Sequence, residues 1–169
     1  MERSVERANR TINDLLAFSR ITPLEAKPAD LLELLRWVVT EMRLPPEMQV
    51  RVEADEGLPP AFIDPVQMEQ VLHNLLLNAF QAMPQGGEVE VRLVKAEDRL
   101  TLIVSDRGCG IAPDDLSRVF EPLFSTRAEG TGFGLAVCRR IVEEHGGAIS
   151  IQSTQGEGTT VTVAIPAAG

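Results

Sequence analysis

The sequence predicts an α+β fold, a two-layer α/β sandwich with about five strands in a mixed, mostly antiparallel sheet packed on three helices. Apolar residues recur at three- and four-residue spacing over 31–42, 65–83 and 132–145, which predicts the helices. Apolar and polar residues alternate in the segments between them, which predicts strands. Short turns join the C-terminal strands in pairs, so hairpins dominate the sheet. Each layer can then bury its apolar face against the other.

An amphipathic helix is predicted over residues 2–20. Its apolar seam is narrow, as in a coiled coil, and it is too short to be stable alone. We therefore interpret residues 1–22 as the end of a longer helix that pairs with another helix or chain. Packing on its own domain is the alternative. The seam consists of Val5, Ala8, Ile12, Leu15 and Ser19.

The main domain is predicted to span residues 30–166, after a linker over 23–29 and before a tail over 167–169. Asp30 can cap its first helix. The central helix over 65–83 follows a short strand at 61–63. The other expected elements are strands at 48–54, 89–93, 100–104, 148–153 and 159–165, a short helix at 114–120, a loop at 121–131 and a helix at 132–145.

Composition and charge narrow the classes of partner. The chain has 169 residues, 44% of them hydrophobic, which is enough for one cored domain. Its net charge of −9 argues against nucleic acid and anionic membranes as partners. No apolar stretch approaches the length of about 18 residues that a membrane span requires. Two cysteines without a metal-binding pattern fit a cytoplasmic location.

The central helix carries an unexpected line of carboxamides. Asp64 is a suitable N-cap and Pro65 suits the first helical position. Beyond them, Asn74 and Asn78 lie one turn apart between leucines, and glutamines continue the same face. A buried amide without a partner costs about 1–3 kcal/mol, so this face predicts a polar cavity that holds a ligand. Amide oxygens suit Mg²⁺. The alternative is that these amides cap loops or bind neighbouring strands.

Two glycine-containing motifs follow. Asp106-Arg-Gly-Cys-Gly110 ends a strand, and its carboxylate could accept a hydrogen bond from an exocyclic amine, although such a turn also occurs without function. Gly130-Thr-Gly-Phe-Gly134 precedes a helix, where free N–H groups suit phosphate; a flexible hinge is the alternative. The intervening loop from Phe120 to Arg127 could form a lid, with Arg127 reaching a phosphate, or could be an ordinary surface loop.

The order of these motifs resembles the catalytic ATP-binding domain of sensor histidine kinases, which has a Bergerat-type fold. Residues 74–79, 106–110, 120–124, 130–135 and 156–160 resemble its N, G1, F, G2 and final glycine-threonine boxes. The resemblance covers residues 30–166, and Ile12 to Arg20 is similar to the end of the second dimerisation helix of that family.

The resemblance implies a role for each matched residue. Asp106 would recognise the adenine amino group, Gly108 and Gly110 would shape that pocket, and Thr159 would lie behind it. Asn78 would bind Mg²⁺ beside the catalytic Asn74. The remaining ATP-binding positions would border the triphosphate or form the base of the lid: Phe120, Phe124, Arg127, Gly130, Thr131, Gly132, Gly134 and Leu135.

The resemblance also implies a reaction. Related ATPases carry a water-activating glutamate where this chain has Asn74, so the amide favours phosphoryl transfer over hydrolysis. The two histidines, His73 and His145, do not match the phosphoacceptor of the family. We therefore expect transfer to a histidine on a dimerisation domain outside this chain, then to a response regulator receiver domain, within a homodimeric parent protein that could be membrane-anchored.

A second departure from the family and two alternative functions remain. Many family members have a basic residue where this chain has Gln81, which leaves Arg127 as the main candidate cation near the triphosphate. An ATPase clamp of the same fold is one alternative function, and steady hydrolysis would favour it. A non-catalytic nucleotide-binding interaction module is the other.

Overall fold

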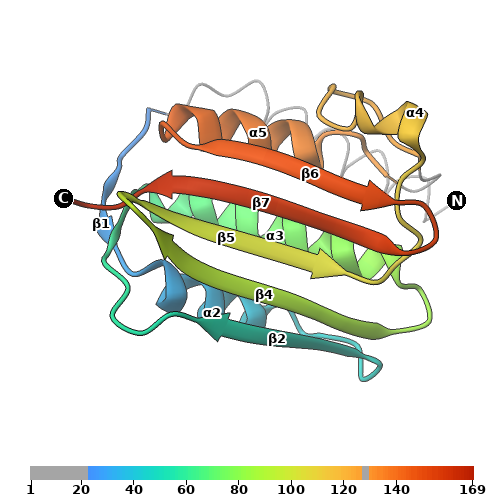
Figure 1. The fold of residues 1–169 in the computed structure, drawn as a ribbon, viewed down its shortest axis with the longest axis horizontal. Coiled ribbons are helices and arrows are strands. Elements are labelled where there is room, and N and C mark those ends of the chain that lie inside the picture. Colours follow the sequence, from blue (N-terminus) through green and yellow to red (C-terminus); the bar gives the residue numbers. More distant parts are fainter. Residues whose placement is uncertain (1–22, 127–129) are drawn as a thin grey trace, which may run out of the picture.

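A computed structural model describes residues 23–126 and 130–169 as two layers, a five-stranded sheet and three longer helices on one of its faces (Figure 1). This arrangement confirms the predicted fold class. The strand order is β2-β4-β5-β7-β6. The strands are β2 (Met48–Ala54), β4 (Gly87–Ala96), β5 (Arg99–Asp106), β6 (Ala148–Thr154) and β7 (Gly158–Pro166), and the helices are α2 (Leu31–Glu41), α3 (Pro65–Ala82) and α5 (Gly134–Glu144).

The sheet is mixed because one pair of neighbouring strands is parallel. β2 runs parallel to β4, with Val50 opposite Val89, and α3 lies in the connection between them. A parallel pair needs such a crossover. The other neighbours, β4-β5, β5-β7 and β7-β6, are antiparallel. The central helix therefore crosses behind the sheet and lies under β5 and β7 (Figure 1).

A second, two-stranded sheet involves the segment that we predicted as a linker. β1 (Lys27–Ala29) pairs antiparallel with β3 (Ala61–Ile63). The C-terminal segment is hydrogen-bonded to the residue before β3, since the Ala168 N–H donates to the Pro60 carbonyl at 2.8 Å. Periodicity alone did not indicate β1, because a three-residue strand is too short to show alternation.

Two helices differ from the sequence prediction by more than one residue at one end. The short helix α4 covers only Pro113–Leu116 and not 114–120. α5 begins at Gly134 and not at Gly132, because Gly132 has a φ of +74°. That left-handed conformation cannot continue a right-handed helix.

The core lies between the sheet and the apolar face of α3. Val71, Leu72, Leu75 and Leu76 are at most 2% exposed, and they belong to one cluster with the inward-facing residues of β4, β5 and β7. The central helix is therefore held rigidly, together with the polar face that it carries.

The predicted helix over 2–20 and the predicted role of Arg127 lie outside the described residues. Among the residues that the structure describes, no helix combines the length and apolar character that crossing a membrane would take.

Candidate functional site

A pocket of about 590 Å³ lies between α3, the first turn of α5 and the ends of β5, β6 and β7. The amide face of the central helix opens into it: Gln70, Asn74, Asn78 and Gln81 all line the pocket, together with the exposed His73. The predicted polar cavity is therefore present. Asn74 also bonds to the neighbouring helix, since its Nδ2 donates to the Gly134 carbonyl at 3.4 Å.

The first turn of α5 forms one wall. Gly134 lies against both asparagines: an added Cβ there would be 3.9 Å from Asn78 Nδ2 and 4.0 Å from Asn74 Cγ. The N-cap residue, Phe133, makes no side-chain capping bond. Backbone N–H groups at such a helix start suit an anion. This wall therefore places hydrogen-bond donors next to the amide oxygens of α3.

The opposite wall is the inner face of the sheet. Asp106 on β5 stands directly opposite Thr159 on β7, and both line the pocket. Val104, Ile151 and Val161 continue this wall with apolar side chains. The wall therefore combines a carboxylate and a hydroxyl with apolar side chains. A flat, partly apolar ring with an amino group at one edge would fit it.

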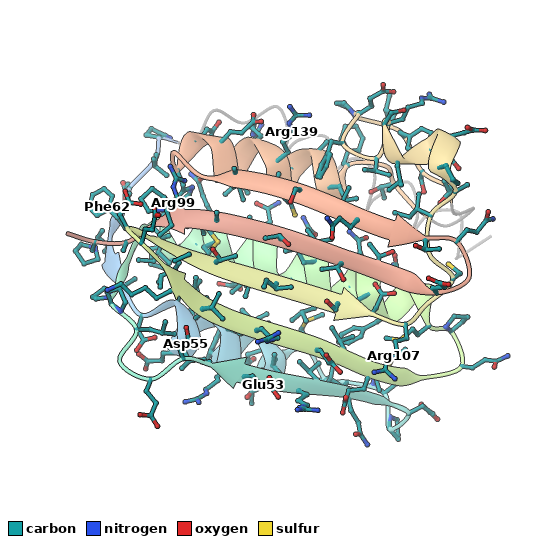
Figure 2. The ribbon with its side chains drawn as sticks, in the orientation of Figure 1. Glu53, Asp55, Phe62, Arg99, Arg107 and Arg139 are labelled. Carbon is teal, nitrogen blue, oxygen red and sulfur yellow. The ribbon has the colours of Figure 1, made fainter. Side chains whose placement is uncertain are left out.

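The glycines of the 106–110 motif allow two close approaches. A Cβ on Gly108 would lie 2.5 Å from the Ala82 carbonyl oxygen, and one on Gly110 would lie 2.1 Å from the Thr154 carbonyl oxygen. Asp106 Oδ1 accepts a 2.8 Å bond from the Gly108 N–H, which fixes the carboxylate. Gly110 lines the pocket, whereas Gly108 holds the loop against the end of α3. In Figure 2, Arg107 marks this loop at the end of β5.

The segment before α5 borders the pocket mouth. Phe124, Gly130, Thr131 and Gly132 line the pocket from this segment, and Leu135 lines it from α5 itself. Phe120 does not: the guanidinium of Arg139, which Figure 2 labels on α5, lies 5.7 Å from its ring centroid. Phe120 therefore supports this segment from outside the pocket. Arg118 lies over the Phe124 ring at 4.4 Å.

A buried cysteine lies behind the asparagines. Cys138 on α5 donates to the Val71 carbonyl at 3.8 Å, and burial raises the pKa of its thiol to about 12, partly opposed by a hydrogen bond with Asn74. The thiol is therefore neutral and acts as a packing group. It helps to hold α5 against the face of α3 that carries the site.

Sequence reasoning missed Ser153. This residue does not line the pocket, but it contacts Thr159, which does. Ser153 on β6 stands opposite Thr159, and their hydroxyl oxygens are 2.8 Å apart. A signal was present: Ile149 and Ile151 face inward, so strand alternation places Ser153 on the same side. Only the pairing with β7 shows which residue it contacts.

The fold and this pocket define a nucleotide-binding domain, and comparison with known proteins identifies its family. The family described as histidine kinase-, DNA gyrase B-, and HSP90-like ATPase matches residues 63–169, so the chain belongs to it. Within that family it is a catalytic ATP-binding domain of the two-component sensor histidine kinase type. The sensor histidine kinase ZraS of Escherichia coli K12 is 40% identical over 169 residues, which cover 98% of this chain and 36% of ZraS. The chain thus spans about a third of that relative.

Solved structures agree with this assignment. Full-length ShkA in complex with AMPPNP matches with a TM-score of 0.81 and 28% identity, over 94% of this chain and 35% of ShkA. The histidine kinase ThkA in complex with the response regulator protein TrrA matches with a TM-score of 0.82 and 25% identity, over 98% of this chain and 48% of ThkA.

Proposed function

We propose that this chain binds ATP with Mg²⁺ and donates the γ-phosphoryl group to a histidine on a dimerisation domain of its parent protein. One observation carries the proposal: Asn74 and Asn78 on α3, Asp106 on β5 and the glycine segment before α5 all line a single pocket. At one end of the pocket, the Asp106 carboxylate can accept a hydrogen bond from an adenine amino group. At the other end, backbone N–H groups can bind phosphate, so the pocket matches the two ends of a nucleotide.

The donor set fits Mg²⁺ held jointly with a nucleotide. Among residues 23–126 and 130–169, no three His, Cys, Asp or Glu side chains gather into a metal site. Mg²⁺ commonly takes few protein ligands and completes its octahedron with water and phosphate oxygens. Asn78 would supply an amide oxygen. When bound, the ion would neutralise charge on the triphosphate during transfer.

The residues of this chain would position the γ-phosphoryl group and would not themselves form or break a covalent bond. Asn74 is held by the Gly134 carbonyl, and an amide is too weak a base to activate water. We therefore assign Asn74 to orienting the γ-phosphoryl group for an incoming imidazole, not to hydrolysis. Phosphoryl transfer depends mainly on positioning and charge neutralisation, which such a site can supply.

One solved relative supports the proposed onward partner. ThkA was crystallised with a response regulator, and by analogy we propose that a receiver domain takes the phosphoryl group after the histidine. His145 is buried and bonded on both ring nitrogens, which makes it unsuitable as an acceptor. We propose that the parent protein acts as a homodimer and that this domain works in the cytoplasm.

Calorimetric titration of the chain with a non-hydrolysable ATP analogue, with and without Mg²⁺, tests the binding. We expect micromolar affinity that weakens without Mg²⁺. Labelled ATP should then phosphorylate a histidine-bearing dimerisation domain of a related sensor kinase and leave the chain itself unlabelled. Steady release of inorganic phosphate without labelling of that domain would instead support an ATPase clamp. Binding with neither product would support a nucleotide-binding interaction module.

A further inference from the structure

Three polar side chains form one row across the inner face of the sheet. Asp106 on β5 is paired with Thr159 on β7, and Thr159 is paired with Ser153 on β6. All three continue the inward-facing positions of their strands. Asp106 and Thr159 line the pocket, whereas Ser153 stands behind Thr159 and does not.

The hydrogen bonds of Ser153 fix the direction of every proton around it. Ser153 Oγ lies 2.8 Å from the Gly158 carbonyl, and a carbonyl can only accept, so the serine proton is donated there. Ser153 Oγ accepts from the Ile111 N–H at 2.8 Å. The third contact, with Thr159 Oγ1 at 2.8 Å, then requires the threonine to donate. Otherwise two oxygen lone pairs would face each other at that distance.

This direction determines what Thr159 offers to a ligand. With its only proton given to Ser153, Thr159 Oγ1 presents lone pairs alone to the pocket. A carboxylate such as Asp106 likewise only accepts when ionised. The polar end of this wall therefore accepts hydrogen bonds and cannot donate from these side chains. A ligand amino group at this place can donate hydrogen bonds to these acceptors, whereas a ligand carbonyl oxygen would place one more acceptor against them.

We propose that Ser153 is a positioning residue that makes the site select 6-aminopurine nucleotides over 6-oxopurine nucleotides, by holding the Thr159 hydroxyl in its acceptor orientation. The proposal rests on the function proposed above, because it concerns the base of the bound nucleotide. Ser153 acts through Thr159 and would not touch the nucleotide.

The same strands provide a matched control on the other face of the sheet. Ser105 on β5 and Thr160 on β7 also share a hydroxyl–hydroxyl bond, of 2.9 Å, and neither lines the pocket. Ser105→Ala therefore removes an equivalent hydroxyl from the sheet without changing the proton directions next to Thr159. Ser153→Thr keeps a hydroxyl at the proposed position.

The experiment measures the affinities of a non-hydrolysable ATP analogue and of inosine triphosphate, a 6-oxopurine nucleotide, for the native chain and the variants. The native chain should prefer ATP. In Ser153→Ala the Thr159 hydroxyl can rotate and donate to the 6-oxo group, so the preference should fall by about two- to tenfold, the size of one hydrogen bond. Ser153→Thr and Ser105→Ala should keep the native preference.

Several results would overturn the proposal. A merely structural Ser153 would weaken both nucleotides by the same factor and leave the preference unchanged. Thr159→Val provides an independent check if Ser153→Ala does not fold: its preference should also fall, and an unchanged preference refutes the role of the hydroxyl. Adding Ser153→Ala to Thr159→Val should change nothing further. Failure of the native chain to bind ATP would refute the proposed function itself, whereas ATP binding with an unaltered preference refutes this inference alone.

Discussion

The buried imidazole of His145 accepts a 2.9 Å hydrogen bond at Nε2 from the backbone N–H of Asp64, 81 residues earlier in the chain. Its Nδ1 donates to the Ile141 carbonyl at 2.7 Å, because a carbonyl can only accept. The Asp64 carboxylate in turn accepts from the N–H groups of Val66 and Gln67. The C-cap residue of α5 thus holds the N-cap residue of the helix that carries the asparagines.

We expect His145→Ala to lower the free energy of unfolding by about 1–3 kcal/mol, because it leaves a buried N–H at Asp64 without an acceptor. Thermal or denaturant unfolding measures the loss. His73→Ala provides the control, since His73 is exposed and should alter stability little. Nitrogen NMR should find His145 protonated at Nδ1. Protonation at Nε2 instead would contradict the assigned hydrogen bonds.

Asp106→Asn should weaken binding of the ATP analogue at least tenfold, about 1.4 kcal/mol, because the amide introduces a donor where the adenine amino group needs an acceptor. Isothermal titration of both chains measures the change. Asp114→Asn is the control: Asp114 is exposed on α4 and does not line the pocket. Equal affinities of the native chain and Asp106→Asn would remove Asp106 from the adenine site.

Asn78→Ala should abolish the part of the ATP affinity that depends on Mg²⁺, because it removes the proposed amide oxygen ligand. Affinities of the variant measured with Mg²⁺ and with a chelator should therefore be similar. Asn78→Asp, which retains an oxygen ligand, should preserve the dependence. A full Mg²⁺ effect in Asn78→Ala would place the ion elsewhere.

Gly132→Ala should weaken nucleotide binding as well as stability. Gly132 has a φ of +74°, and a Cβ there would lie 2.4 Å from the Leu123 carbonyl carbon, so the segment at the pocket mouth must move. Gly57→Ala is matched in backbone, with a φ of +67°, but its Cβ would meet nothing within 4 Å. Both variants should lose about 1–2 kcal/mol to the left-handed conformation, and only Gly132→Ala should lose affinity.

Cys138 should make the domain less stable at high pH. Burial raises the pKa of its thiol from 9.0 to about 12. As the pH rises above about 9, the unfolded chain releases this proton first, which favours unfolding until the folded thiol also ionises near pH 12. Stability should fall by about 1.4 kcal/mol per pH unit from this group in that window.

Denaturant titrations between pH 8 and pH 11 measure the slope. Cys138→Ala should show a shallower decline than the native chain, because the other titrating groups are common to both. Thiol labelling of the folded chain should modify only the exposed Cys109, and both cysteines after unfolding. Rapid labelling of Cys138 in the folded chain would show that α5 does not stay packed.

The spacing of apolar and polar residues in the sequence determined the helices and most strands. It also determined that α3 carries one apolar face and one line of amides. Helix and strand periods differ, so apolar spacing separates them, and Asp64 and Pro65 mark the start of the central helix. The amide line was visible for the same reason, since Asn74 and Asn78 lie one turn apart. The motif order then predicted which segments would meet around a nucleotide.

Only the tertiary structure decided which residues meet across strands and between helices. The row of Asp106, Thr159 and Ser153 depends on the register of three strands, and the bond from Asp64 to His145 joins two helices. Periodicity fixes which face a side chain occupies but not its partner, because register is set by packing between segments far apart in the chain. The positive φ of Gly132, at which α5 cannot yet begin, and the close approach of Gly132 to Leu123 are likewise seen only in the folded chain.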